Sequence, residues 1–155
     1  MRISAVLVLW LLCTRPALAL LCGSFLSPMT VSATNLSFGV YAPGGTRTAN
    51  TSVTIKCAIP LDLLPDFHVR LSAGNAATPA ARYLKLGSGQ LFYNIYADPG
   101  FASVWGDGGS GSVEQVYDGL LSLGAVTLTG FGRLPAGQYV PAGTYGDRIT
   151  VTVVF

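Results

Sequence analysis

A single histidine and a glycine-rich serine loop are the residues of this sequence that could carry out catalysis. His68 lies on the polar side of an alternating stretch, and the pattern places no partner beside it, so it does not read as a catalytic base. The loop 106–112, Gly-Asp-Gly-Gly-Ser-Gly-Ser, has the composition found around the nucleophile of serine proteases. A nucleophile elbow would need glycine where Ser112 stands, and one carboxylate is too few for a calcium loop. We therefore interpret the loop as a mobile β-turn and predict that the protein is not an enzyme and needs no cofactor.

The first nineteen residues have the features of a secretory signal peptide. Arg2 supplies a positive charge, residues 5–12 are apolar, and Ala17-Leu18-Ala19 is a small-x-small cleavage site. The apolar run is shorter than the roughly 18 residues that span a bilayer, which disfavours the alternative of a retained membrane anchor. We predict a signal peptide over 1–19 and one secreted domain over 20–155. Without the signal, seven basic and seven acidic residues remain, and no basic patch indicates nucleic acid as a partner.

Two cysteines, Cys22 and Cys57, remain after the predicted cleavage, because Cys13 leaves with the signal peptide. An even pair in an exported protein most simply forms one disulfide. Closing a loop of about 35 residues would stabilise the fold by roughly 3–4 kcal/mol on the chain-entropy model. Lipidation of Cys22 is an alternative, but a small residue would be expected before it. A zinc site is less favoured, since structural zinc takes four ligands.

Short stretches of alternating apolar and polar residues, separated by glycine- and proline-rich turns, make up the rest of the chain. Such spacing predicts an all-β sandwich without helices. The expected strands cover residues 29–41 (with a bulge at 34–35), 51–59, 67–71, 82–86, 90–97, 121–134 and 147–155.

The strand expected over 147–155 is the most informative part of the sequence. Ile149, Val151, Val153 and Phe155 alternate with Arg148, Thr150, Thr152 and Val154, so they share one face. A strand this apolar needs a covered inner face and a paired edge, and an uncharged edge invites pairing with another chain. We expect this end to be completed by another polypeptide.

Six motifs in order identify a resemblance to the spore coat protein U domain family. They are Val31–Tyr41, Leu91–Asp98, Val104–Gly108, Phe131–Gln138, Ala142–Asp147 and Val151–Phe155. The resemblance implies a secreted subunit of an archaic chaperone–usher pilus, built as an incomplete immunoglobulin-like β-sandwich that lacks its last strand. It also implies a periplasmic pilus chaperone, an outer-membrane usher and neighbouring pilin subunits as partners, and location on the cell surface. The donor-strand groove and chaperone-binding edge would then include Ile149, Val151, Val153 and Phe155.

Two departures from the family pattern bear on the role within the fibre. Only Leu20 and Leu21 precede Cys22 after cleavage, where related pilins carry a donor strand, and Met29 stands where the family has its first cysteine. These features favour a tip or minor subunit, with roles in adhesion and biofilm. The alternative function is a spore-coat or cell-surface protein assembled without an usher. A carbohydrate-binding module using Trp105 and Tyr139 is disfavoured, because large aromatic residues mostly serve cores.

Overall fold

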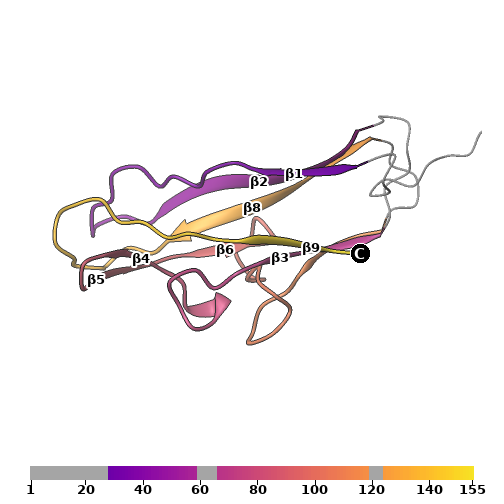
Figure 1. Ribbon diagram of the computed structural model, residues 1–155. Helices are drawn as coiled ribbons and strands as arrows, with labels where there is room; N and C mark the ends of the chain where they lie inside the picture. Colours follow the sequence, from indigo (N-terminus) through magenta and orange to yellow (C-terminus); the bar gives the residue numbers. More distant parts are fainter. Residues whose placement is uncertain (1–27, 59–65, 119–123) are drawn as a thin grey trace, which may run out of the picture.

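The computed structural model describes residues 28–58, 66–118 and 124–155, and its regular secondary structure is β-strand apart from one short 3₁₀ turn (Figure 1). The elements are β1 (Met29–Ala33), β2 (Arg47–Cys57), β3 (Phe67–Leu71), the 3₁₀ turn η1 (Pro79–Ala81), β4 (Tyr83–Leu86), β5 (Gly89–Phe92), β6 (Asn94–Tyr96), β7 (Gln115–Tyr117), β8 (Ala125–Leu134) and β9 (Val151–Val154). The all-β prediction is confirmed.

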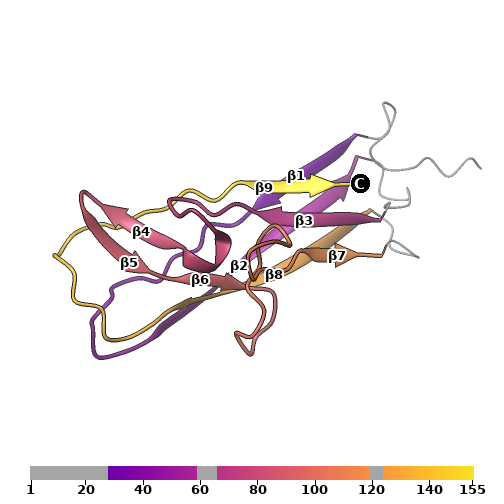
Figure 2. The ribbon, with the colours of Figure 1, turned by 90° about the horizontal axis from the view of Figure 1, so that it is seen from below.

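The strands form two main sheets. One has the order β1-β2-β8-β6 and the other β7-β3-β9, while β4 and β5 form a separate hairpin. The hairpin closes on a two-residue turn at Gly87, whose φ of 55° suits glycine. β1 and β9 are each the last strand of a sheet, and Figures 1 and 2 place both on the same side of the sandwich.

The core lies between the sheets and follows the alternation of the sequence. Every second residue is buried in β3 and in the second half of β2, from Val53 to Cys57, whereas the residues between them are exposed or partly buried. The buried apolar residues are Val53, Ile55, Cys57, Phe67, Val69, Leu71, Leu91, Tyr93, Ile95, Trp105 and Leu134. The inward faces predicted for 51–57 and 67–71 are therefore confirmed.

Several predicted boundaries were wrong. The first strand ends at Ala33, and residues 34–41 make no strand pairing. The last strand forms a ladder only over Val151–Val154, because it can pair only as far as the five-residue β3 extends. β7 was not predicted, since three residues are too few to show a period. The long strand predicted within 121–134 is confirmed as β8, whereas the boundaries predicted at 59 and 121 lie outside the described residues.

Polar contacts hold the two sheets together on the side away from β1 and β9. The backbone N–H of Trp105 donates to the carbonyl of Ile95 in β6, at 2.9 Å, and its indole N–H donates to the carbonyl of Val69 in β3, at 2.8 Å. One fully buried residue thereby bonds to a strand of each sheet.

Candidate functional site

A groove of about 930 Å³ opens between the sheets on the side where β1 and β9 lie. Its floor is the apolar core, and two extended segments without long ladders, 33–41 and 140–151, contribute to its sides. Among the described residues that line it, Asp147 carries the only charged side chain. A groove with an apolar floor and a single charged lining residue is suited to an extended peptide.

The first side is formed by residues 34–41, which are fastened at both ends. Thr34 donates its N–H to the carbonyl of Ser52 at 2.9 Å, and its hydroxyl accepts the Ser52 N–H at 2.8 Å. At the other end the Tyr41 hydroxyl donates to the carbonyl of Pro135 at 3.0 Å. Between these anchors Leu36 packs onto the core. This fastening by distant residues explains why the segment does not continue as the predicted strand.

Tyr41 and Gln138 together hold the loop that leads toward the second side. The Gln138 N–H donates to the Tyr41 hydroxyl at 3.0 Å. The Gln138 side chain accepts the N–H of Phe92 at 2.6 Å and donates to the Phe92 carbonyl at 2.9 Å and to the Pro135 carbonyl at 3.0 Å. This amide pairs with the end of β5 much as a strand residue would.

Asp147 fixes the second side to the floor. Its carboxylate accepts the Tyr93 hydroxyl at 2.8 Å and the backbone N–H of Asn75, also at 2.8 Å. Burial, followed by the hydrogen bond to Asp147, raises the pKa of Tyr93, so this phenol stays protonated and remains a donor. Gly74, with φ of 65°, lies so close to the carboxylate that no side chain would fit.

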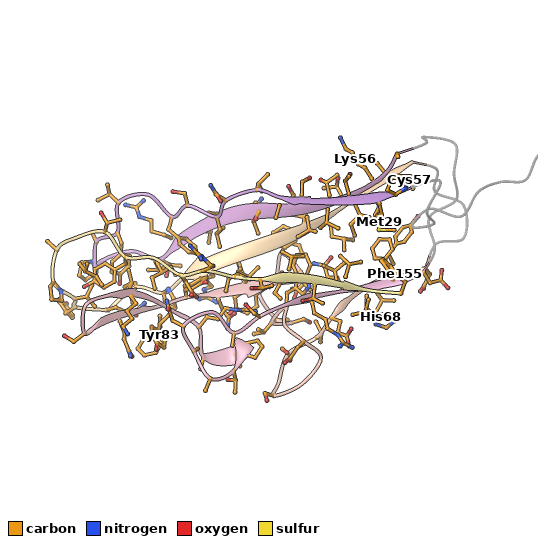
Figure 3. The ribbon with its side chains drawn as sticks, in the orientation of Figure 1. Met29, Lys56, Cys57, His68, Tyr83 and Phe155 are labelled. Atoms are coloured by element: carbon orange, nitrogen blue, oxygen red, sulfur yellow. The ribbon has the colours of Figure 1, made fainter. Side chains whose placement is uncertain are left out.

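The structure separates the four predicted groove residues into two groups. Ile149 and Val151 line the groove. Val153 is partly buried and packs on the core, but it is not among the groove-lining residues. Phe155 follows the end of β9 and is 72% exposed (Figure 3).

Ala33 at the end of β1 lines the groove and was missing from the predicted site, and Val31 lies on the same face of that strand. Val31 stands opposite Ile55 in the β1–β2 ladder, so both side chains point to the inner face. Ile55 is fully buried, whereas Val31 is 45% exposed. The alternation of Val31 and Ala33 in the sequence was the signal for this face, but the sequence alone does not show that β1 is an edge strand.

Cys57 is buried at the end of β2, directly opposite Met29 (Figure 3). The N–H of Ala58 donates to the carbonyl of Pro28, so the neighbouring pair is hydrogen-bonded and the Met29–Cys57 pair is of the closely spaced, non-hydrogen-bonded kind. Cys22 lies outside the described residues, and its pairing with Cys57 stays a prediction.

The residues considered for catalysis do not assemble into a catalytic site in the described part of the chain. His68 is exposed as expected, but it does have a partner: its Nδ1 lies 3.0 Å from Glu114, which also accepts two hydrogen bonds from Arg70. The Ser112 hydroxyl donates within its own loop, to Asp107 at 3.1 Å and to the carbonyl of Gly109 at 2.6 Å.

The described ranges contain neither a metal-binding cluster nor a membrane-spanning helix. No group of three or more His, Cys, Asp or Glu residues is arranged to hold a metal ion there. None of the helices there is long and apolar enough to cross a membrane. Trp105 is fully buried, so the sugar-binding alternative is wrong for this residue, whereas Tyr139 is exposed.

Comparison with solved structures finds a similar fold in a pilus assembly complex. The chain resembles a chain of the crystal structure of the CsuC–CsuE chaperone–tip adhesion subunit pre-assembly complex from the archaic chaperone–usher Csu pili of Acinetobacter baumannii. The TM-score is 0.61 at 20% identity, over 83% of this chain and 40% of that one. The two chains thus share a fold.

Comparison by sequence gives the family. No curated protein sequence matches the chain. The family model of the Spore Coat Protein U domain matches residues 13–152, which is most of the sequence. The predicted resemblance is confirmed, and the chain belongs to the Spore Coat Protein U domain family.

Proposed function

We propose that this chain is a secreted structural subunit of an archaic chaperone–usher pilus whose sandwich is completed by a β-strand from another chain. A periplasmic chaperone lends the first strand, a neighbouring pilin subunit replaces it, and an outer-membrane usher passes the subunit to the cell surface. Family membership supports the proposal, as does the fold shared with a complex from chaperone–usher pili.

The observation that carries the proposal is a set of inward-facing apolar residues that remain exposed at the edges of both sheets. On β1 this is Val31, opposite the buried Ile55. On β9, Val151 stands opposite Leu71 and is only partly buried. In a closed sandwich such positions would be covered, so we infer a missing strand between β1 and β9.

A donated strand would act on both the backbone and the side chains. It would pair with the free edge of β9, and its own alternate residues would fill the groove, which is strand addition to an open sheet. Covering Ile149 and Val151, the two residues of this segment's apolar face that line the groove, is worth up to roughly 3–6 kcal/mol before ordering costs. An uncomplemented subunit should therefore be unstable or prone to aggregate.

The test is co-expression of the chain with a periplasmic pilus chaperone, compared with expression alone. We expect a soluble one-to-one complex that is lost in Val151→Asp, because this side chain faces the groove. Val154→Asp is the matched control, since Val154 lies on the outer face of the same strand and should still bind. A soluble, cooperatively folding monomer without any partner would refute the proposal and favour a coat or surface protein assembled without an usher.

A fusion that gains solubility is a clearer test than Val151→Asp, because a substituted chain could lose the complex simply by failing to fold. An alternating apolar strand fused after Phe155 through a short turn should make the chain soluble without a chaperone. The same fusion with serine at its apolar positions should not. Equal solubility of the two fusions would contradict strand completion.

We also propose a cleaved signal peptide, a Cys22–Cys57 disulfide and a tip or minor position in the fibre. Residues 1–19 and Cys22 lie outside the described residues, so signal cleavage and the Cys22–Cys57 disulfide call for mass spectrometry of the exported protein under non-reducing conditions. A tip or minor position, adhesion and biofilm formation would be tested by labelling the subunit on intact pili. Labelling along the whole shaft would exclude the tip position.

A further inference from the structure

The outer face of the four-stranded sheet carries a cluster of aromatic and polar side chains, on the opposite face of the sheet from the groove. Asn50 stands opposite Phe131, and Phe131 stands opposite Tyr96, so the three form one row across β2, β8 and β6. Arg133 follows two residues after Phe131 on the same face. We call these residues, with Phe101, the outer aromatic cluster.

Phe101 joins the cluster from a loop held in an unusual conformation. Its φ is 57°, a left-handed value that is costly for a residue with a side chain. The Asp98 carboxylate fixes the loop by accepting the N–H groups of Ala102 and Ser103, and these bonds, led by that of Ser103, lower the pKa of Asp98. The Phe101 ring is thereby presented edge-on to Tyr96, with ring centroids 5.4 Å apart.

The polar members of the cluster are available to a ligand. Cζ of Arg133 lies 5.5 Å from the centroid of the Phe101 ring, which orients the guanidinium group. Within the described part of the chain, neither this guanidinium group nor the Asn50 side chain makes a hydrogen bond, and both residues are exposed. A guanidinium group with free donors is suited to a planar carboxylate.

The charge of the sheet favours an anionic ligand. Lys56 and Arg133 lie on its outer face, and its four strands contain no aspartate or glutamate; Arg47, opposite the buried Leu134, belongs to the other face. The nearby Asp98 carboxylate already accepts backbone N–H groups. Aromatic surfaces beside a few placed polar groups are typical of small-molecule binding sites, and a sugar ring offers an apolar face together with hydroxyl groups.

We propose that the outer aromatic cluster binds an acidic polysaccharide, with a uronic acid ring packed on Phe101 and Phe131. The Arg133 guanidinium group pairs with the uronate carboxylate, and the Asn50 amide bonds to sugar hydroxyl groups. This site would give the protein a surface ligand of its own. It does not depend on strand completion, because the groove lies on the inner face.

The test measures binding of polygalacturonate to the full chain, in the soluble form obtained with or without a chaperone. Fully methyl-esterified polygalacturonate, which lacks the charge, is the ligand control. Arg133→Gln should weaken binding about tenfold or more, because it removes a charged hydrogen-bonding group. Arg148→Gln is the matched control for charge, since Arg148 is exposed outside the cluster.

A second variant distinguishes loss of binding from loss of folding. Phe101→Gly removes the ring but suits the left-handed backbone, so the chain should fold and bind the polymer about tenfold or more weakly. The proposal is overturned if polygalacturonate does not bind, if both arginine variants lose binding equally, or if the esterified polymer binds as well as the acidic one.

Discussion

Replacing the buried Arg82 should destabilise the floor of the groove more than any change of an exposed basic residue. Arg82 is 1% exposed. Its guanidinium group donates to the carbonyls of Ser72 at 2.7 and 2.9 Å, Leu71 at 3.2 Å and Trp105 at 2.8 Å, and to the Asn94 side chain at 3.0 Å. Burial lowers the pKa of Arg82, so these carbonyls offset the cost of a buried cation. The residue links β6 to the end of β3.

The magnitude follows from the groups that would lose their donor. In Arg82→Met the buried carbonyls of Leu71 and Trp105 and the partly buried carbonyl of Ser72 lose this donor, at about 1–3 kcal/mol each, and the removal of the buried charge returns part of the loss. We expect the free energy of unfolding to fall by about 3–5 kcal/mol. With a urea slope of about 2 kcal/mol per molar, the midpoint should fall by about 2 M. Arg82→Lys keeps the charge but loses the planar guanidinium group, so its urea midpoint should lie between those of the unmodified chain and Arg82→Met.

The assay is urea unfolding followed by the fluorescence of Trp105, in the soluble form that co-expression or strand fusion provides. Trp105 is the only tryptophan outside the predicted signal peptide, and its carbonyl is bound by Arg82. Lys85→Met is the control, because Lys85 is an exposed basic residue on β4, the strand that begins directly after Arg82. A loss below about 1 kcal/mol in Arg82→Met would refute the reasoning, since that is the size of a single ordinary hydrogen bond.

Three further perturbations test other parts of the structure. In a Cys22→Ala chain, Met29→Cys should form a disulfide with Cys57, because the two positions form a closely spaced pair; free thiols on both residues under oxidising conditions would contradict the register. Gln138→Glu should lower the free energy of unfolding by about 1–2 kcal/mol at neutral pH, and by less in acid, because a carboxylate replaces a donor that faces two carbonyls. Equal stability at both pH values would be inconsistent with that bonding. The hydrogen bond from Arg70 lowers the pKa of Glu114 below its ordinary value of 4.5, so its stabilising effect is present above that pH and is lost as pH falls through the folded-state pKa. Glu114→Gln should flatten this acid limb of the stability curve, and an unchanged limb would exclude the pair as its cause.

Local alternation was sufficient to predict the strands that form the core. The segments around Val53 and Val69 alternate cleanly, and the structure buries the expected faces. The same signal failed after Ala33, although Leu36 and Phe38 continue an apolar spacing. There the backbone follows anchors at Thr34 and Tyr41, whose partners are 18 and 94 residues away. Contacts of such separation have no local signature.

Only part of the groove could be predicted from the sequence, because the rest depends on contacts between residues that are far apart in the chain. The alternation of Ile149 and Val151 indicates a strand with one apolar face. That β1 lies at the same opening depends on the order of strands in two sheets, which is a property of the whole fold. The partner of His68 was missed because Glu114 belongs to the segment just before β7, a strand too short to predict.

The placement of polar contacts explains how such a sandwich could stay open on one side. On the side of β6, Trp105 and Arg82 bond to both sheets, and directional bonds between buried groups fix the spacing of the layers. Within the described residues, no hydrogen bond joins β1 to β9. On their inner faces these two strands carry the apolar side chains of Val31 and Val151. The contacts of Trp105 and Arg82 on the other side of the sandwich therefore fix the spacing of the sheets and keep the groove open. Substitutions near Arg82 should impair folding of the subunit itself, whereas substitutions at Val151 should impair capture of a strand. Comparing unfolding with chaperone binding for the two classes of variant would separate these roles.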